Sequence, residues 1–211
     1  MGHRGHSARN GRPYGPDPFG RDAQNRTRIA QVAAKLIAEH GIVDWSLAKR
    51  KAARQLMLSE REALPADSEI EAALTEHHAL FGGAAHDETL HGQRKEALAW
   101  MHRLEAFRPM LVGGVAAGWA TEHSDIRVEL CADDAKAVEL ALINSGVRYR
   151  VPPGRSRDIP SELHIETSHG GVRLIVVTDA ARRQRPRRDA QGNEEARLSI
   201  DALTALLLAE K

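Results

Sequence analysis

Two short motifs in this chain combine the residue types that phosphate chemistry needs. Gly113 and Gly114 stand side by side after an apolar run, and Ser124 and Asp125 open a second run ten residues later. Glycines let a backbone approach a phosphate closely, and a carboxylate at the start of a strand can bind Mg²⁺. The spacing therefore predicts a phosphate-binding turn followed by an acidic strand, which phosphoryl-transfer enzymes use together.

The run from Asp125 places three charged side chains on one face of the predicted strand. Side chains alternate between faces along a strand, so Asp125, Arg127 and Glu129 point to one side and the apolar residues between them point to the other. Two interpretations stay open. The three charged side chains line a site beside the glycine turn, or they form an ion-pair ladder on a solvated face.

Helices are predicted to precede these motifs. Residues 1–21 are rich in Gly, Pro and Arg and nearly free of aliphatic residues, so we expect a disordered arm there. Residues 22–108 carry apolar residues at helical spacing and form the predicted helical segment. The first of its four helices ends at Gly41, and the second is capped by Ser46 and ends near residue 57. The third spans about residues 67–81, and the fourth spans about residues 87–107.

Pro109 marks a change to short β-branched runs, which are typical of strands. An amphipathic helix is expected at residues 133–145 and a closing helix from Ser199 to Ala209. The fold class predicted for residues 109–211 is therefore α+β, with a small mixed sheet and flanking helices. The five expected strands are residues 110–115, 126–131, 147–151, 163–167 and 172–177.

The motifs together resemble the minimal nucleotidyltransferase domain of the DNA polymerase beta superfamily. The chain also resembles, over about residues 26–208, proteobacterial proteins that carry this fold behind a helical segment, in the stretches RIAQVAAKLIAEHGI, SLAKRKAARQL and GGVAAGWATEHSDIRVEL. The resemblance implies that Gly113 and Gly114, with Ser124, cradle the nucleotide phosphates. It also implies that Asp125 is a catalytic carboxylate that binds Mg²⁺.

The chain departs from the family pattern of Gly-Ser, Asp-x-Asp and a third Asp on a later strand. Gly114 replaces the serine, Arg127 replaces the second carboxylate, and Arg173 is the only charge on the later strand. Glu129 and Glu166 are the candidates to complete the metal site, Glu129 also as a catalytic residue. Alternatively, Arg127 and Arg173 hold a phosphate without metal, since a guanidinium binds phosphate bidentately. We therefore expect a nucleotidyltransferase-like protein that transfers a nucleotidyl group or only binds nucleotide or phosphate.

Clusters of basic residues suggest a different function, in which the chain binds nucleic acid or a protein partner without catalysis. Such electrostatic binding would weaken steeply with salt. A solvated charged surface is the alternative for both clusters. They comprise Lys49, Arg50, Lys51 and Arg54 on the second predicted helix, and Arg182, Arg183, Arg185, Arg187 and Arg188 in an expected loop.

The composition indicates the cellular compartment and excludes some classes of protein. The 211 residues carry a net charge of only +1, contain one cysteine, Cys131, and have no apolar run long enough to span a membrane. We therefore expect a cytoplasmic protein that does not insert into a membrane and has no internal disulfide. Trp45 and Trp119 are expected to anchor packing. The histidines at 77, 78, 86 and 91 lack zinc-motif spacing and are expected at the surface. The oligomeric state stays open.

Overall fold

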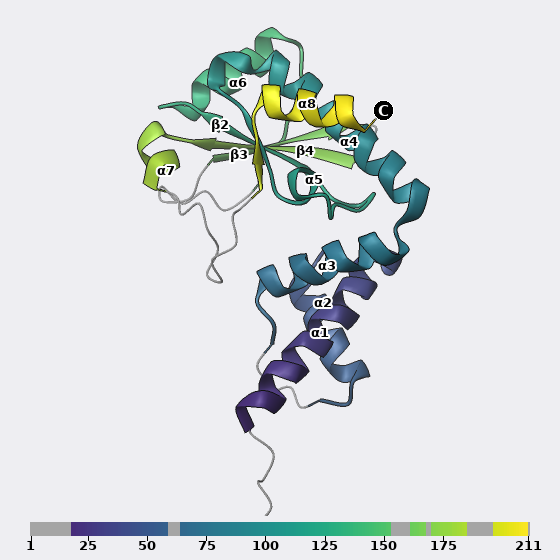
Figure 1. Cartoon of the computed structure of the whole chain (residues 1–211). Coiled ribbons are helices and arrows are strands. Elements are labelled where there is room, and N and C mark those ends of the chain that lie inside the picture. Colours follow the sequence, from purple (N-terminus) through teal and green to yellow (C-terminus); the bar gives the residue numbers. More distant parts are fainter. Residues whose placement is uncertain (1–17, 59–63, 153–160, 168–169, 185–195, 211) are drawn as a thin grey trace, which may run out of the picture.

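The computed structural model describes residues 18–58, 64–152, 161–167, 170–184 and 196–210. Helices α1 (Pro18–His40), α2 (Trp45–Gln55) and α3 (Asp67–Phe81) pack into a bundle that we call the helical lobe (Figure 1). Small residues line its core and let the helices approach closely. The fully or nearly fully buried residues there include Ile29, Ala33, Ala34, Ala48, Ala52, Ile70 and Leu74.

Local signals set the helix ends. Gly41 follows α1 with a φ of +62°, a conformation that favours glycine. Helix α2 begins two residues earlier than expected, because its N-cap is Asp44 and not Ser46: the Asp44 carboxylate accepts a hydrogen bond from the Leu47 amide at 3.1 Å. Before α3, the Glu69 carboxylate accepts one from the Ala66 amide at 2.7 Å. The bounds predicted for this third helix are confirmed.

The second half forms a mixed sheet in an α+β fold, as predicted, and this sheet has five strands, not all of them the expected ones. The sheet order is β3-β4-β2-β1-β5, with β2 and β4 parallel and the other neighbours antiparallel. In register, Ile126 lies opposite Val172 and Val128 opposite Leu174, which gives the sheet one continuous apolar face. The strands are β1 (Met110–Val112), β2 (Ile126–Cys131), β3 (Ser161–Thr167), β4 (Gly170–Val177) and β5 (Arg197–Leu198).

Three helices cover that apolar face: α4 (Gly83–Arg103), α6 (Ala135–Asn144) and α8 (Ile200–Ala209) (Figure 1). They contribute buried residues such as Met101, Leu142 and Leu203 to one core with the sheet. We call this unit the sheet lobe. Because α4 packs into the sheet core, the two hydrophobic clusters separate at Gly82–Gly83, whereas the sequence placed the division near Pro109.

Several expected elements differ from those observed. Residues 147–151 form no strand and make only a single bridge, between Arg150 and His164. Strand β1 stops at Val112, because Gly113 has a φ of +73° and turns the chain into the short helix α5 (Gly114–Ala117). Residues 18–21 of the expected disordered arm belong to α1, and residues 1–17 lie outside the described residues.

Other elements were not predicted at all. They are the 3₁₀ turn Glu105–Phe107, strand β5 and helix α7 (Asp179–Gln184). Helix α4 begins at Gly83, four residues earlier than expected. In the part of the chain that the structure covers, no helix combines the length and the apolar character needed to cross a membrane.

Candidate functional site

The end of β1 and the beginnings of β2 and β4 meet at one edge of the sheet. Val112 lies opposite Arg127, and Arg127 lies opposite Arg173. Gly113, which follows Val112, and Asp125, which precedes β2, therefore reach the same place from neighbouring strands. The charged side chains point to the face opposite the apolar core, as the alternation in the sequence predicted.

A pocket between the two lobes brings five of the predicted site residues together. They are Gly114, Ser124, Asp125, Arg127 and Arg173. This interlobe pocket has a volume of about 160 Å³. The sheet lobe also contributes Trp119, Thr121 and His123 to its wall. The helical lobe supplies the rest, namely Ile37, Gly41, Ile42, Val43 and Trp45.

The glycine pair is held by two neighbouring side chains. A Cβ atom at Gly113 would lie 3.3 Å from Cδ of Arg127, so the arginine stem packs over this glycine. A Cβ atom at Gly114 would lie 2.6 Å from Cζ3 of Trp119, which is closer than real side chains come. The serine of the family pattern therefore has no room in this chain, because the Trp119 ring occupies its place.

Asp125 and Arg173 form an ion pair inside the pocket. The Arg173 Nη2 atom donates to Asp125 Oδ2 at 2.6 Å, and both side chains are about one-third exposed, at 34% and 37%. Arg173 Nη1 also lies 3.8 Å from Glu162, while its buried Nε has no hydrogen-bond partner among the described residues. Arg127 is exposed, and no ion pair joins it to another residue of the described segments. Within the described segments, a guanidinium without an ion pair thus stands beside one that is held by a carboxylate.

A buried glutamine positions the loop that carries Asp125. Gln93 of α4 is 1% exposed, and its Nε2 donates to the Thr121 carbonyl at 2.9 Å. Ser124 Oγ in turn accepts a hydrogen bond from the Thr121 amide at 2.9 Å. This bond turns the Ser124 hydroxyl toward its own loop. Its predicted contact with a phosphate therefore stays a prediction.

Glu129 lies apart from the pocket, although it shares a sheet face with Asp125. Its side chain is fully buried and forms ion pairs with Arg182, whose Nε lies 2.8 Å away, and with Arg197. Burial alone would raise the pKa of Glu129, but the hydrogen bonds and charges of the two arginines lower it below its usual value. Glu129 is therefore a stable carboxylate that cross-links β2, α7 and β5.

The only cysteine lies beside this cluster. The Cys131 thiol donates to Asp179 Oδ1 at 3.0 Å and accepts from Arg108 Nη2 at 3.1 Å. Burial and the hydrogen bond to Asp179 raise the pKa of the thiol. The hydrogen bond from Arg108 and the one from Cys131 lower the pKa of Asp179 to about 2. Cys131 is buried, as expected, but it is also part of a polar network.

Glu166 belongs to a second pocket, of about 470 Å³, on the other side of the Asp125–Arg173 pair. Asp125 and Arg173 line both pockets and form the wall between them. Glu166 is 81% exposed and pairs with Arg150. His164 also lines this pocket and lies 3.3 Å from Glu162.

These surroundings do not fit a Mg²⁺ site. Asp125 is engaged by Arg173, Glu129 is buried under two arginines, and Glu166 is held by Arg150. Among the residues with assigned positions, no three His, Cys, Asp or Glu side chains converge in a way that would hold a metal ion. A cation bound at any of these three carboxylates would lie close to a guanidinium, whose like charge would repel it.

The two basic clusters are only partly available to a polyanion. Lys49 is 13% exposed and pairs with Asp67 at 2.6 Å, so it does not belong to the solvent-exposed face of α2. Arg50, Lys51 and Arg54 are exposed there. Arg182 and Arg183 lie in helix α7 and not in a loop, with Arg182 bound to Glu129 and Arg183 exposed. The remaining three, Arg185, Arg187 and Arg188, lie outside the described residues.

Three histidines expected at the surface instead stack at the junction of α3 and α4. The rings of His78 and His86 are 3.8 Å apart and nearly parallel, and the ring of His77 follows at 5.8 Å from that of His78. His86 Nε2 lies 3.2 Å from the Gly118 carbonyl, next to Trp119. Burial, with the charges of His86 and His77, lowers the pKa of His78 to about 4.

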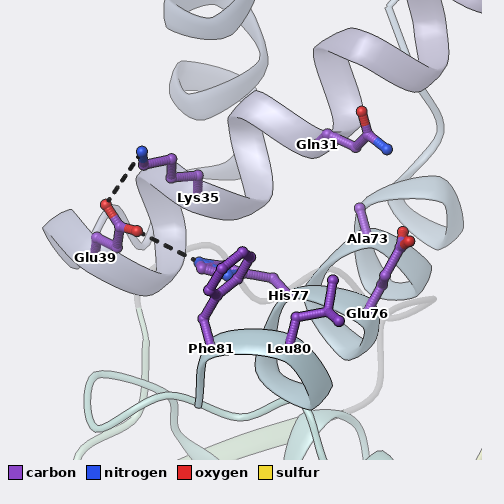
Figure 2. Close-up of a pocket in the computed structure, with 8 residues that line it drawn as sticks. All are labelled: Gln31, Lys35, Glu39, Ala73, Glu76, His77, Leu80 and Phe81. Carbon is purple, nitrogen blue, oxygen red and sulfur yellow. Dashed lines mark ion pairs between the residues drawn. The ribbon is translucent and has the colours of Figure 1, made fainter.

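A further pocket lies between α1 and α3 and contains none of the predicted site residues (Figure 2). Its polar side includes Lys35, Glu39 and His77, which form a row of ion pairs with distances of 3.8 Å and 3.7 Å. The exposed side chains of Leu80 and Phe81 form its apolar side.

Comparison of the chain with protein-family models, curated proteins and solved structures gives no match. The functional argument therefore depends on the geometry of the pocket. Sequence reasoning missed the contribution of the helical lobe, namely Ile42, Val43 and the pocket face of Trp45. No local pattern indicates this contribution, since the three residues lie about 70 positions before Gly114 in the chain.

Proposed function

We propose that the chain binds the phosphate groups of a nucleotide in the interlobe pocket, on a nucleotidyltransferase-like core whose acidic set has been reduced to Asp125. One observation carries the proposal. Gly114, Asp125, Arg127 and Arg173 come from three separate stretches of sequence and line a single pocket. The order β4-β2-β1, with β2 parallel to β4, supports the same core, because it brings the glycine turn and the acidic strand together.

Arginine takes the role that metal would have in the complete family pattern. Arg127 and Arg173 occupy paired positions on parallel strands, so their guanidinium groups can bind one polyphosphate from adjacent strands. Charge-assisted hydrogen bonds of this kind contribute roughly 1.5–3 kcal/mol each. Transfer of a nucleotidyl group is not part of the proposal, because the carboxylates needed for two-metal chemistry are bound to arginines.

Isothermal titration with ATP, GTP, CTP and UTP, with and without Mg²⁺, tests this function. We expect binding without Mg²⁺, and a loss of about tenfold or more in the Arg127→Ala variant. The matched control is Arg54→Ala, since Arg54 is an exposed arginine that does not line the pocket. Unchanged affinity in Arg127→Ala would refute the proposal.

A second variant separates arginine-based binding from metal-based binding. Asp125→Asn removes the carboxylate that competes with phosphate for Arg173. Arginine-based binding predicts an affinity equal to or higher than that of the native chain. If binding instead requires Mg²⁺ and disappears in this variant, Asp125 is a metal ligand and the nucleotidyltransferase activity would have to be reconsidered.

The rival function, polyanion binding through the basic clusters, has less support. Lys49 and Arg182 are engaged in ion pairs with Asp67 and Glu129. A triple variant of Arg50, Lys51 and Arg54 to alanine should therefore leave nucleotide affinity unchanged. A steep, salt-dependent affinity for RNA or DNA that this variant abolishes would favour the rival.

A further inference from the structure

The two halves of the interlobe pocket differ in chemistry. The sheet lobe contributes Asp125, Arg127 and Arg173, whereas the helical lobe contributes Ile42, Val43 and Trp45. Val43 is 69% exposed, which leaves its apolar surface available at the pocket. A ligand that satisfies both halves must carry negative charge at one end and an apolar group at the other.

Two tryptophans, Trp45 of the helical lobe and Trp119 of the sheet lobe, provide an aromatic surface. The ring centroids of Trp45 and Trp119 lie 5.3 Å apart with their planes at 56°, and both rings are only partly buried. Tryptophan faces stack on planar ring systems, and such stacking on a nucleobase is worth about 1–3 kcal/mol by alanine substitution. The apolar end of the ligand is therefore best matched by an aromatic ring.

The size of the pocket indicates how a ligand would lie. At about 160 Å³ it is smaller than the roughly 300 Å³ from which small-molecule sites usually begin. The neighbouring pocket of about 470 Å³ is reached across Asp125 and Arg173, which line both. A nucleotide would thus place its base against the helical lobe and its first phosphates beside Arg127 and Arg173, and the end of its polyphosphate would extend over Arg173 toward the neighbouring pocket.

We infer that the helical lobe forms the nucleobase side of the site, with Trp45 as the stacking surface, and that the ligand is a nucleotide and not a simple polyphosphate. This inference rests on the proposed function. It assigns the helical lobe a direct role in recognition, although its residues lie 70 or so positions upstream of the phosphate-binding motifs. It also assigns Trp45 a role beyond packing.

The test compares ATP with inorganic tripolyphosphate, which offers the same charged groups without a base. We expect ATP to bind the full chain at least tenfold more tightly, and Trp45→Ala to reduce ATP affinity about tenfold while leaving tripolyphosphate affinity unchanged. Trp45→Phe keeps a ring and should lose much less. Trp100→Phe is the control, because Trp100 lies on α4 and does not line the pocket.

A milder variant covers the case in which Trp45→Ala does not fold. Val43→Ser alters an exposed residue, so it should keep the fold and weaken ATP about two- to threefold with no effect on tripolyphosphate. Equal affinities for the two ligands, or equal losses in the variants, would overturn the inference and leave the proposed phosphate binding intact. Binding of neither ligand would refute the proposed function itself.

Discussion

At the scale of single residues, the position of the Trp119 ring accounts for the glycine at position 114. The indole ring lies where a side chain at position 114 would point, and both residues line the interlobe pocket. A side chain at position 114 would clash with this ring unless the ring moved. At Gly113 the reason for glycine is different, because the backbone φ of +73° lies in a region that other residues rarely adopt.

We predict that Gly114→Ser destabilises the protein by about 1–3 kcal/mol, the usual cost of overpacking a well-packed site. Urea unfolding followed by circular dichroism measures this. Ala117→Ser, at an exposed position of the same short helix, is the control and should be close to neutral. A Gly114→Ser variant as stable as the native chain would show that Trp119 moves aside freely.

Glu129 gives the second prediction at this scale. Removing it in Glu129→Ala leaves Arg182 and Arg197 partly buried without their carboxylate, which should cost about 3–5 kcal/mol. Since the pKa of Glu129 is lowered in the folded state, its stabilising effect is present above the ordinary value of 4.5 and is lost as pH falls through the lower folded value. Urea midpoints between pH 3 and 7 should reveal the effect. Glu122→Ala, at an exposed position, should change little.

At the scale of elements, the sequence predicted those whose signals are local. Strand β2 and helices α3 and α8 follow from alternation, helical spacing and capping residues, and their observed bounds agree with the prediction to within one or two residues. The expected strand at 147–151 failed, because β-branched residues alone do not supply a neighbour with which to pair. Strand β5 has only two residues and forms only because it pairs with β1, for example at Leu111–Leu198, two residues that are 87 positions apart in the chain.

The α3–α4 junction gives a pH prediction. Because the pKa of His78 falls from 6.5 to about 4 on folding, the unfolded chain binds more protons between these values, and stability should decline as pH falls from 6.5 toward 4. After discounting for solvent screening we expect a loss of roughly 1–2 kcal/mol. In His78→Gln this decline should shrink, as measured by urea midpoints across that range, whereas His102→Gln, at an exposed position, should keep it. An identical decline in His78→Gln would contradict the assignment.

At the scale of the whole molecule, the candidate site depends on how two hydrophobic clusters meet. Sequence patterns predicted that the glycine turn lies beside the charged face of the strand at 126–131, but they contained no information on which lobe surface would face these residues. Trp119 belongs to the sheet lobe in sequence, yet its ring packs against the cluster of the helical lobe. Contacts of this kind depend on tertiary packing, which no local periodicity encodes.

We predict that Trp119→Ala uncouples the lobes. Scanning calorimetry of the native chain should give one transition, and the variant should give two, because each lobe keeps its own hydrophobic cluster. Trp100→Ala is the control, since Trp100 packs only against the sheet-lobe cluster, and it should lower the transition temperature without splitting the transition. A single transition in Trp119→Ala would show that other contacts couple the lobes.

The polar network around Cys131 has a practical consequence. A thiol that is 6% exposed and held between Arg108 and Asp179, with its pKa raised, should react slowly with alkylating reagents. Since it is the only cysteine in the chain, one new surface cysteine on each lobe would accept a pair of fluorescent dyes with little background labelling. Energy transfer between such dyes would then report directly on any movement of one lobe relative to the other.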